Sequence, residues 1–547
     1  MKTKNISLII PSWKPLNIDM QAETGSKYPS LMLLNGVPLV NHIYNEYKKH
    51  YNELKCYLIF PENEIIKLIN KIDARIEIIK ITHSSSIGET INNALEKIEL
   101  NENLIVHMAD TFIKLKSKRF DKDLICIQSS KDSFRLTSLK KDISGPLKII
   151  SDREFLFNAK LHDVAIGVFH IVKVDRFKMI LKNIIRKNSQ ELNNNTDPFF
   201  QAIELYSIEN DFVLEYVNEW NDFGNIDNYY KSKINFQNLR HFNSLSYDQK
   251  KGRVTKISKN KLSFRNQVRW YSQVPNDIQP YLPRIFDRND GKEPFITMEL
   301  LPIPSLSELY VQDNLSIGDW NVIGNSVVEI LELFENYTSK NNVLPHLCYE
   351  MYVNKTIHRI QQFIEQNKGA ENLFVEYRNT KLNLSYVLGT ISDYSERNDL
   401  LKNTLIQPIH GDLCFSNILY DKRNRSVKLI DPRGDFGFPG IFGDKRYDLA
   451  KLLHSFDGGY DLIVTENFNL SKFKNQIECN INFSETQVGI KKLYNALLFR
   501  DDKLLKQCRS IQALLFLSML PLHKDNPNRQ LAFLSNGLKL YFDSLID

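Results

Sequence analysis

Four polar residues in the segment 409–437 have types and a spacing that suit phosphoryl transfer. Asp412 is followed, after four intervening residues, by Asn417, and Asp431 ends the next apolar run. Phosphoryl transfer needs an oriented acceptor hydroxyl and neutralised phosphate charges. Asp412 can orient the hydroxyl as the catalytic carboxylate, and the hard oxygen atoms of Asn417 and Asp431 can hold Mg²⁺. The fourth residue, His410, is expected to hold the loop by a hydrogen bond rather than to act as an acid or a base.

Two short strands must position these side chains. The runs 417–421 and 426–431 read as strands that are joined by the turn DKRNR. Pairing of these strands would place Asn417 and Asp431 on adjacent pieces of backbone. The alternative is a capped turn whose buried aspartates accept backbone N–H bonds, which explains one such residue more readily than four.

The first 235 residues alternate between short apolar runs and helical patterns. Apolar runs stand at 6–10, 56–60, 75–81 and 103–110, and helical patterns include 38–50 and 62–72. Short buried strands with intervening helices predict βαβ units and a mainly parallel sheet. The loops that follow the strands would then lie along one edge, where ligands bind in open α/β sheets.

A domain boundary is predicted around 231–250, where this alternation is lost and the chain becomes polar and basic. The expected domains are therefore 1–235 and 240–547. Beyond residue 252 a few short strands are followed, from residue 317, by mostly helical periodicity, which predicts an α+β second domain.

The composition is that of a folded soluble protein with more than one domain: 547 residues, 42% hydrophobic and 25% charged. A formal net charge of +6 is too thinly spread to predict nucleic acid or an anionic membrane as a partner. Six scattered cysteines without a CxxC pair fit a reducing cytoplasm better than disulfides or zinc sites. The first apolar run is too short for a signal peptide, and no run reaches the ~20 apolar residues of a membrane span. We therefore expect a cytoplasmic protein without membrane insertion.

The motif HGDLCFSN…LIDPRG resembles the aminoglycoside phosphotransferase and choline kinase branch of the protein-kinase-like fold. The resemblance covers about 240–547 and implies two lobes, a small one at 240–302 and a large one at 303–547. It also implies that ATP and Mg²⁺ bind between them, with the catalytic and metal-ligating residues at the positions inferred above.

Other parts of that family's site can be sought in the expected small lobe. Lys256 lies on an alternating strand and is the candidate to contact the α- and β-phosphates. The family pairs this lysine with a helical Glu, whereas this chain offers Gln267, which can hydrogen-bond an ammonium group but cannot neutralise it. Backbone groups of Glu299 and Leu301 would recognise the base at the hinge. Only Gly252 marks the hairpin over the phosphates, so a Gly-rich loop is not predicted.

Two later stretches, 443–455 and 521–530, combine charged residues with apolar helical spacing. Because the large lobe binds the acceptor in the family that the motif resembles, both stretches are candidates to line the acceptor pocket. Salt-bridged helix ends are the alternative explanation.

Two aspartates of the first domain follow strands of the predicted sheet. Asp110 ends the run 103–110, and Asp222 lies in the sequence WNDFG after another strand. Carboxylates on neighbouring strand ends can hold one Mg²⁺ that bridges a triphosphate. A helix cap or a turn is the alternative explanation for either aspartate taken alone.

The first domain is similar to sugar-1-phosphate and phosphocholine-type nucleotidyltransferases of MobA-like architecture over about 1–235, through KYPSLMLLNGVPLVNHI at 27–43. The similarity implies a Rossmann-like fold and CTP or another NTP as substrate. It places Ser86 and Gly88 near the nucleobase, where Ser86 would cap a helix together with Glu89 and Gly88 would allow close approach.

The phosphate-binding loop departs from that family. The loop after the first strand holds a single glycine, Gly25, and Ser30 stands where the family has a lysine. Lys14 or Lys27 can substitute for that lysine. The domain is therefore expected either to act through a variant loop or to retain the fold with little activity.

These patterns together favour a bifunctional transferase. It would phosphorylate a small-molecule alcohol or sugar with ATP and then transfer a nucleotidyl group to the phosphorylated metabolite, giving a CDP- or NDP-linked precursor for a surface polysaccharide. Choline, ethanolamine or a polyol is the first choice of acceptor, followed by a sugar. The alternatives are a kinase with a degenerate regulatory first domain, a non-catalytic nucleotide-binding scaffold, and a first domain that acts as a glycosyltransferase.

Overall fold

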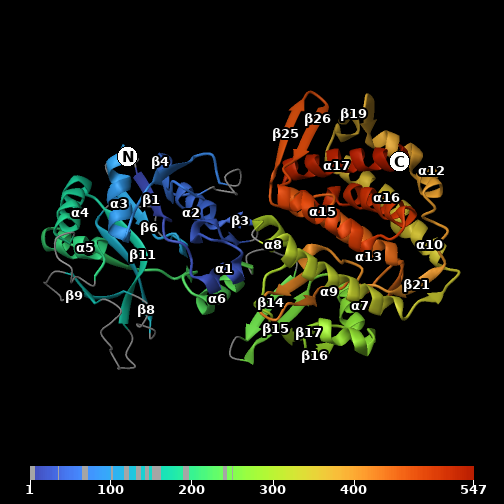
Figure 1. Ribbon diagram of the computed structural model, residues 1–547, viewed down its shortest axis with the longest axis horizontal. Coiled ribbons are helices and arrows are strands. Elements are labelled where there is room, and N and C mark those ends of the chain that lie inside the picture. The colour runs from blue at the N-terminus through green and yellow to red at the C-terminus, as the bar shows by residue number, and fades with distance from the viewer. Residues whose placement is uncertain are drawn as a thin grey trace. The chain divides into compact units, whose positions relative to one another are not determined.

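The computed structural model describes residues 6–34, 36–64, 72–99, 103–115, 122–130, 137–141, 147–150, 162–188, 196–237, 243–248, 251–313 and 315–546. The chain divides into two compact units, Met1–Gln237 and Asn238–Asp547 (Figure 1). One large sheet organises the first unit, whereas small sheets and many helices form the second. Within these described ranges, no helix has both the length and the apolar character that crossing a membrane requires.

Among the described residues, the sheet of the N-terminal unit has nine strands, and its centre is parallel. β6, β1, β4 and β5 lie side by side in parallel register, and β11 pairs antiparallel with both β6 and β8. The strands are β1 (Ile6–Pro11), β4 (Leu54–Pro61), β5 (Ile76–Ile81), β6 (Asn103–His107), β8 (Leu124–Ser130), β9 (Ser138–Lys141), β10 (Leu147–Ile150), β11 (His162–Ile171) and β12 (Val213–Tyr216).

Three helices of this unit, α3, α4 and α5, pack together against the sheet (Figure 1). Their buried side chains, among them Ile91, Phe177 and Phe199, meet Val106 and Ile125 of the strands. Burying each such side chain contributes about 1.5–3 kcal/mol, so this apolar layer is the core of the unit. The helices are α1 (Ile18–Thr24), α2 (Leu39–Lys48), α3 (Ile87–Lys97), α4 (Val174–Asn188), α5 (Pro198–Glu209) and α6 (Ile226–Gln237).

Two short ribbons accompany the sheet. They are formed by β7 (Thr111–Ile113) with β13 (Trp220–Asp222), and by β2 (Leu33–Leu34) with β3 (Val37–Pro38). The first ribbon matters most for the candidate site, because its register sets Asp222 opposite Thr111, directly beyond the end of β6.

The prediction of a mainly parallel sheet is confirmed for the centre of this unit. The four apolar runs predicted as strands are β1, β4, β5 and β6, and the helical pattern 38–50 contains α2. The ten residues of β11 depart from the prediction, because they insert antiparallel between β6 and β8. The direction of this strand is set by its tertiary partners, because no residue pattern of β11 itself specifies antiparallel pairing with β6 and β8. Most of the helix predicted at 62–72 lies outside the described residues.

The C-terminal unit begins with a four-stranded antiparallel sheet, in the order β14-β15-β17-β16, against which α7 packs. Its elements are β14 (Asn243–Asp248), β15 (Arg253–Ser258), α7 (Lys261–Gln273), β16 (Ile285–Asn289) and β17 (Phe295–Glu299). The strands predicted at 252–258 and 293–301 are β15 and β17. Lys256 of β15 is buried, which is unusual for a lysine and requires a partner.

Helices dominate the rest of this unit, as the periodicity from residue 317 predicts. They are α8 (Leu306–Gln312), α9 (Ile317–Glu335), α10 (Leu344–Cys348), α11 (Lys355–Gln366), α12 (Leu384–Arg397), α13 (Lys445–Phe456), α14 (Tyr460–Val464), α15 (Glu485–Leu498), α16 (Asp502–Ser518) and α17 (Pro527–Ile546). The short 3₁₀ segments η4 (Asn276–Tyr281), η7 (Phe415–Asn417) and η8 (Leu520–His523) connect longer elements.

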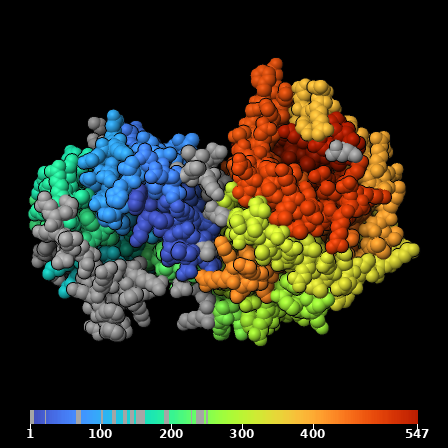
Figure 2. All heavy atoms as spheres, viewed as in Figure 1, coloured from blue at the N-terminus to red at the C-terminus, as the bar shows by residue number. Residues whose placement is uncertain are grey.

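Three small sheets complete the unit. The first pairs β18 (Ser339–Lys340), β21 (Leu405–Pro408) and β24 (Phe442–Gly443), and the second pairs β22 (Ile418–Asp421) with β23 (Ser426–Leu429). The third joins β19 (Phe374–Tyr377), β20 (Thr380–Asn383), β25 (Phe468–Phe473) and β26 (Gln476–Ile481). The two hairpins of this third sheet stand out from the surface of the unit (Figure 2).

A π-helical segment, Tyr349–Asn354, joins α10 to α11 without a break. A π turn holds more residues than an α turn, so the side chains that follow it are rotated relative to an uninterrupted α-helix. Lys355 is the first residue of α11, and its direction therefore depends on this segment.

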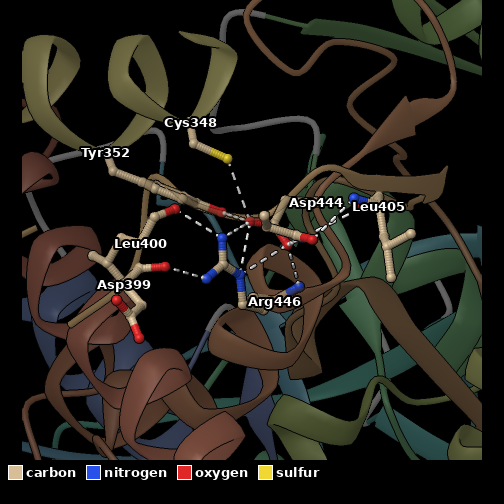
Figure 3. Close-up of polar contacts among 8 residues, drawn as sticks. Cys348, Tyr352, Asp399, Leu400, Leu405, Asp444 and Arg446 are labelled. Carbon is tan, nitrogen blue, oxygen red and sulfur yellow. Dashed lines mark hydrogen bonds and ion pairs between the residues drawn. The ribbon is translucent and has the colours of Figure 1, made fainter. Parts of the chain in front are cut away.

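The start of α13 is fixed by a buried ion pair (Figure 3). The carboxylate of Asp444 accepts hydrogen bonds from Arg446 at 2.7 and 2.9 Å and from the Tyr352 hydroxyl at 3.0 Å. Arg446 also donates to the backbone oxygens of Asp399 and Leu400. Removing one partner of such a pair typically costs about 3–5 kcal/mol, so α13 is tied firmly to the segments around it.

The loop after Asp431 packs closely against α7 at Gly434. This glycine has a φ of 67°, in the left-handed region that side chains disfavour. A Cβ atom at this position would lie 2.1 Å from the backbone oxygen of Asn266. Both the conformation and the contact with a backbone atom therefore require glycine.

We expect Gly434→Ala to lower the free energy of unfolding of the C-terminal unit by at least about 1–3 kcal/mol, through backbone strain and the clash with α7. Urea unfolding followed by circular dichroism measures the change. Gly389→Ala is the matched control, because Gly389 is an exposed residue of α12 with no atom within 4 Å of the added Cβ. That control should stabilise the helix by up to about 1 kcal/mol, and equal destabilisation by both changes would contradict the analysis.

Candidate functional site

The loop that carries His410 and Asp412 is held by one carboxylate. Asp448 of α13 accepts the backbone N–H of His410 at 2.7 Å and that of Gly411 at 2.8 Å. Asp448 is 1% exposed. Burial raises its pKa to about 7, and the two N–H bonds act in the opposite direction. The geometry of the loop is therefore set by a side chain that lies outside the motif.

The ring of His410 ties the same loop to the chain just before Asp431. Its Nε2 lies 2.9 Å from the backbone oxygen of Ile430, while Nδ1 accepts the backbone N–H of Asp412 at 3.3 Å. Because Nδ1 accepts a hydrogen bond, Nε2 carries the proton. Burial lowers the pKa of His410 to about 4, so the ring is neutral at physiological pH. These contacts are those of a residue that holds the loop.

Asp412 lies between a cation and an amide. Lys451 Nζ is 2.8 Å from Asp412 Oδ1, and the amide nitrogen of Asn417 donates to Oδ2 at 3.0 Å. Burial opposes ionisation of Asp412, but Lys451, His410 and Arg433 outweigh it and lower its pKa to about 2. The carboxylate is ionised at neutral pH and can accept a hydrogen bond from an alcohol.

Asp431 meets the two residues predicted in the small lobe. Lys256 Nζ lies 2.7 Å from Asp431 Oδ1, and Gln267 Nε2 lies 3.4 Å from the same atom. Asp431 has a φ of 58°, an uncommon conformation for a non-glycine residue that turns the chain sharply after β23. The backbone N–H of Ile430 donates to the backbone oxygen of Asn417 at 3.0 Å, which keeps the two predicted metal ligands adjacent.

These side chains open into one cleft of about 580 Å³. Its lining comprises Lys256, Ser258, Asn260, Ser263, Phe264, Gln267, Lys355, Arg359, Asp412, Cys414, Ser416, Asp431, Pro432, Arg433, Tyr447, Lys451, His454, Tyr460, Leu515, Ser518, Met519, Leu522 and His523. The stretches 443–455 and 521–530 both contribute, the first through three residues of α13 and the second through Leu522 and His523. The structure thus brings both stretches to the cleft that holds Asp412.

The predicted hinge residues lie elsewhere. Among the described residues, neither Glu299 nor Leu301 lines this cleft. The backbone N–H of Glu299 donates to the backbone oxygen of Arg284 at 2.8 Å, and that of Leu300 donates to Gly252 at 2.9 Å. Recognition of a base by this segment stays a prediction.

The donor atoms of Asn417 and Asp431 fit Mg²⁺, and Asp431 lines the cleft while Asn417 lies directly beside Asp412. Asn417 directs its amide nitrogen toward Asp412, which leaves its amide oxygen as the atom able to ligate a cation. Asp431 keeps a second carboxylate oxygen beyond the one that pairs with Lys256. Within the described residues, no group of three or more His, Cys, Asp and Glu side chains could hold a metal ion. A carboxylate and an amide oxygen are hard ligands of the kind that Mg²⁺ takes, and Mg²⁺ commonly keeps waters and substrate phosphates as its other ligands.

The predicted carboxylates of the N-terminal unit also come together. The backbone N–H of Phe223 donates to the backbone oxygen of Asp110 at 2.8 Å, so the ribbon β7–β13 joins the two segments. A Cβ atom built on Gly224 would lie 3.1 Å from Asp110 Oδ2 and 3.2 Å from Asp222 Oδ1. Burial and the charge of Asp222 raise the pKa of Asp110 to about 6. Two hard carboxylates at the carboxyl end of a parallel strand again suit Mg²⁺.

The residues predicted near a nucleobase have clear structural partners. Ser86 Oγ accepts the backbone N–H of Glu89 at 3.1 Å and caps α3, whereas the Glu89 carboxylate bonds to Ser85. A Cβ atom on Gly88 would lie 2.7 Å from atoms of both Pro198 and Phe199. The close approach at Gly88 is thus made by α5 of the same unit. Contact of Ser86 and Gly88 with a base stays a prediction.

In its described residues, the loop after β1 has no glycine-rich turn whose backbone N–H groups could bind phosphate. Gly25 ends α1 and donates its N–H to Gln21, and the buried hydroxyl of Ser30 accepts a hydrogen bond from Ser12 at 2.7 Å. Lys27 pairs with Glu64, whereas the side chain of Lys14 is exposed. Ser30 stands where the resembled family has a lysine, so Lys14 or Lys27 is the candidate cation for a bound phosphate.

Sequence reasoning missed Lys355, Arg359 and Arg433, which line the cleft. It gave no individual role to Asp448 and Lys451, although both lie in the stretch 443–455 that it predicted to line the acceptor pocket. The helical spacing of two pairs of charged residues could have indicated them. Asp448 and Lys451 are three residues apart, and Lys355 and Arg359 are four apart, so each pair shares one face of a helix. That spacing is equally typical of solvated helix faces, which is why it did not identify a site.

No protein-family model matches the chain, and no curated protein matches it. Solved structures similar to its N-terminal part include a Bacillus anthracis protein assigned as a glucose-1-phosphate thymidylyltransferase, at 10% identity, covering 43% of this chain and 97% of that one, with a TM-score of 0.34. CTP:phosphocholine cytidylyltransferase from Streptococcus pneumoniae gives 14% identity, coverage of 42% and 98%, and a TM-score of 0.34. The nucleoside-diphosphate-sugar pyrophosphorylase from Vibrio cholerae gives 13% identity, coverage of 42% and 99%, and a TM-score of 0.34.

We expect Lys451→Met to raise the pKa of Asp412 by about one to three pH units, because the nearest opposite charge disappears while burial remains. The carboxyl ¹³C shift of Asp412, assigned by comparison with Asp412→Asn, follows the titration. The control is Lys491→Met, since Lys491 pairs with Asp457 and not with Asp412. An unchanged Asp412 titration in Lys451→Met would contradict the electrostatic analysis.

Proposed function

We propose that the chain is a bifunctional transferase. The C-terminal unit would use ATP and Mg²⁺ to phosphorylate an alcohol, and the N-terminal unit would transfer a nucleotidyl group to a phosphorylated metabolite. One observation carries the first activity: the pairs Lys256–Asp431 and Lys451–Asp412 meet in one cleft, with Asn417 beside them. These are a phosphate-contacting cation, hard oxygen ligands and an ionised acceptor for the hydroxyl proton.

In the phosphotransfer step, Asp412 accepts a hydrogen bond from the acceptor alcohol and orients its oxygen toward the γ-phosphorus of ATP. The new P–O bond forms as the bond to the β-phosphate oxygen breaks, ADP leaves, and the hydroxyl proton passes to Asp412. A carboxylate with a pKa of about 2 is a weak base, so its main contribution is orientation, as the loose transition state of phosphoryl transfer requires. Lys256 would meet the phosphates of ATP. Asn417 and Asp431 would hold Mg²⁺, which would neutralise the phosphate charge.

In the second activity, a phosphate oxygen of the metabolite would attack the α-phosphorus of an NTP, with release of pyrophosphate. The convergence of Asp110 and Asp222 around Gly224 supports this proposal. When bound there, Mg²⁺ would offset charge on the triphosphate. The product of the first activity is a phosphorylated alcohol, which is the nucleophile that the second activity needs.

A single-activity kinase with a regulatory N-terminal unit is the second candidate. The observation in its favour is the loop after β1, where Gly25 caps a helix and Ser30 is buried against Ser12. The Gly25 N–H is already donated to Gln21, and the Ser30 side chain is fully buried, so neither group faces a bound triphosphate.

We expect Asp412→Asn to lower ATP-dependent phosphorylation by at least about 100-fold, because the group that orients the hydroxyl is lost, and to leave pyrophosphate release unchanged. A mixed-alcohol screen with ATP and CTP identifies the acceptor by phosphorus NMR. The two activities are then measured in separate reactions, and the phosphorylated alcohol is supplied with the NTP in the second, so that pyrophosphate release does not depend on the first activity. Asp393→Asn, at an exposed position of α12, is the matched control. Equal loss of both activities would refute separate sites.

The converse is expected of Asp110→Asn. Pyrophosphate release from an NTP and the phosphorylated alcohol should fall by at least about 100-fold, while ATP-dependent phosphorylation stays at the parent rate. Asp175→Asn, at an exposed position in the first turn of α4, is the control. If the parent protein releases no pyrophosphate with any of the common NTPs, the single-activity kinase is the correct assignment.

A further inference from the structure

The cleft that holds Asp412 is lined by more cationic side chains than carboxylates. Five cationic side chains and two carboxylates line it. Lys256 pairs with Asp431 at 2.7 Å, and Lys451 pairs with Asp412 at 2.8 Å, so both carboxylates are already engaged. Three cations remain without a close carboxylate of their own.

These three are Lys355, Arg359 and Arg433, which we call the cationic cluster. Among the residues that the structure describes, no carboxylate lies within ion-pair distance of Lys355 or Arg359, while Arg433 reaches Asp435 only at 3.9 Å. Arg433 also donates to the hydroxyl of Tyr447 at 3.1 Å. Partly buried cations are normally paired, so this cluster needs an anion that the chain does not provide.

The members of the cluster repel one another. Lys355 and Arg359 lie one turn apart on α11, an arrangement that destabilises a helix for like charges. Burial lowers the pKa of Lys355, and Arg433 and Lys451 lower it further. Burial of Tyr447 would raise its pKa, yet the neighbouring Lys355, Arg433 and Lys451 produce a net lowering. A surplus of positive charge persists in this part of the cleft.

The cluster lies on the side of the cleft formed by the helical part of the unit. Lys355 and Arg359 come from α11, and Tyr447 comes from α13, whereas Lys256 and Gln267 come from the small sheet and α7. A molecule with a hydroxyl on Asp412 would therefore extend its other end toward the cluster. Guanidinium groups bind carboxylates and phosphates through paired hydrogen bonds, so the chemistry of the cluster selects an anion.

We propose that the phosphate acceptor is an alcohol that also carries a carboxylate or a phosphate group, bound against Lys355, Arg359 and Arg433. This proposal rests on the phosphotransferase function above and specifies its substrate class. The cationic acceptors considered from the sequence, choline and ethanolamine, would meet like charge at the same place. Neutral polyols and sugars would leave the cluster unmatched.

Acceptors that differ mainly in charge test the proposal on the full chain. One series compares glycerol, D-glycerate and glycerol 3-phosphate, and a second compares glucose, glucuronate and glucose 6-phosphate, with choline and ethanolamine as cations. Binding is measured by calorimetry, and transfer is measured as ADP release with ATP and Mg²⁺. We expect only anionic compounds to bind and be phosphorylated, and the carboxylate and phosphate members of each series show which anion is preferred.

The double variant Lys355→Gln/Arg359→Gln should weaken binding of the preferred anion by at least about tenfold and leave the KM for ATP within about twofold. Its thermal midpoint should not fall, since the change removes mutual repulsion. Arg397→Gln, at an exposed position of α12, is the matched control and should behave as the parent protein.

Three results would overturn the proposal: preference for choline or a neutral alcohol, unchanged anion binding in the double variant, or a raised KM for ATP in place of weakened acceptor binding. The last result would assign the cluster to the nucleotide. Anion binding that depends on the cluster but is never followed by ADP release would support an anion-binding pocket at the cluster. It would also refute the proposed phosphotransferase function. The two failures are therefore distinguishable.

Discussion

The candidate phosphotransferase site depends on the two hydrogen bonds between Asp448 and the backbone of His410 and Gly411. A buried carboxylate is unfavourable unless its oxygen atoms are satisfied, and these two N–H groups satisfy one oxygen each. The same two bonds also fix the backbone position of the next residue, Asp412. The position of the Asp412 carboxylate is thus determined by a helix that follows it by more than thirty residues in the chain.

Residues of α13 and its N-cap make three separate contacts that shape the candidate site. Its first turn is tied to neighbouring segments by the pair Asp444–Arg446. One turn on, Asp448 holds the loop, and Lys451 supplies the charge that keeps Asp412 ionised. Because a helix is stiff over this length, the shape of the loop and its electrostatics cannot vary independently. This coupling explains why a single helix gives both geometry and charge to the cleft.

The sequence predicted those parts of the fold and the site that are local in the chain. Asn417 and Asp431 lie at the two ends of one hairpin, so their proximity follows from strand pairing alone. The contact between Lys256 and Asp431 joins residues 175 positions apart and was not predicted. Lys256 was assigned to the site only through the resemblance to a known fold. The antiparallel insertion of β11 and the contact of Gly88 with Pro198 depend on tertiary packing. For the same reason, Lys451 could not be distinguished from the charged residues of an ordinary solvated helix face.

The π-helical segment Tyr349–Asn354 has a consequence for how this cleft could change in evolution. Consecutive residues of an α-helix are separated by about 100° around its axis. Losing one residue from a regular α-helix would turn everything after it by that angle, whereas a π turn accommodates one extra residue. Losing one residue from this segment would therefore restore regular α-helix and leave Lys355 and the rest of α11 directed nearly as before. The length of the chain before α11 can therefore change by one residue in evolution without altering which side chains α11 presents to the cleft.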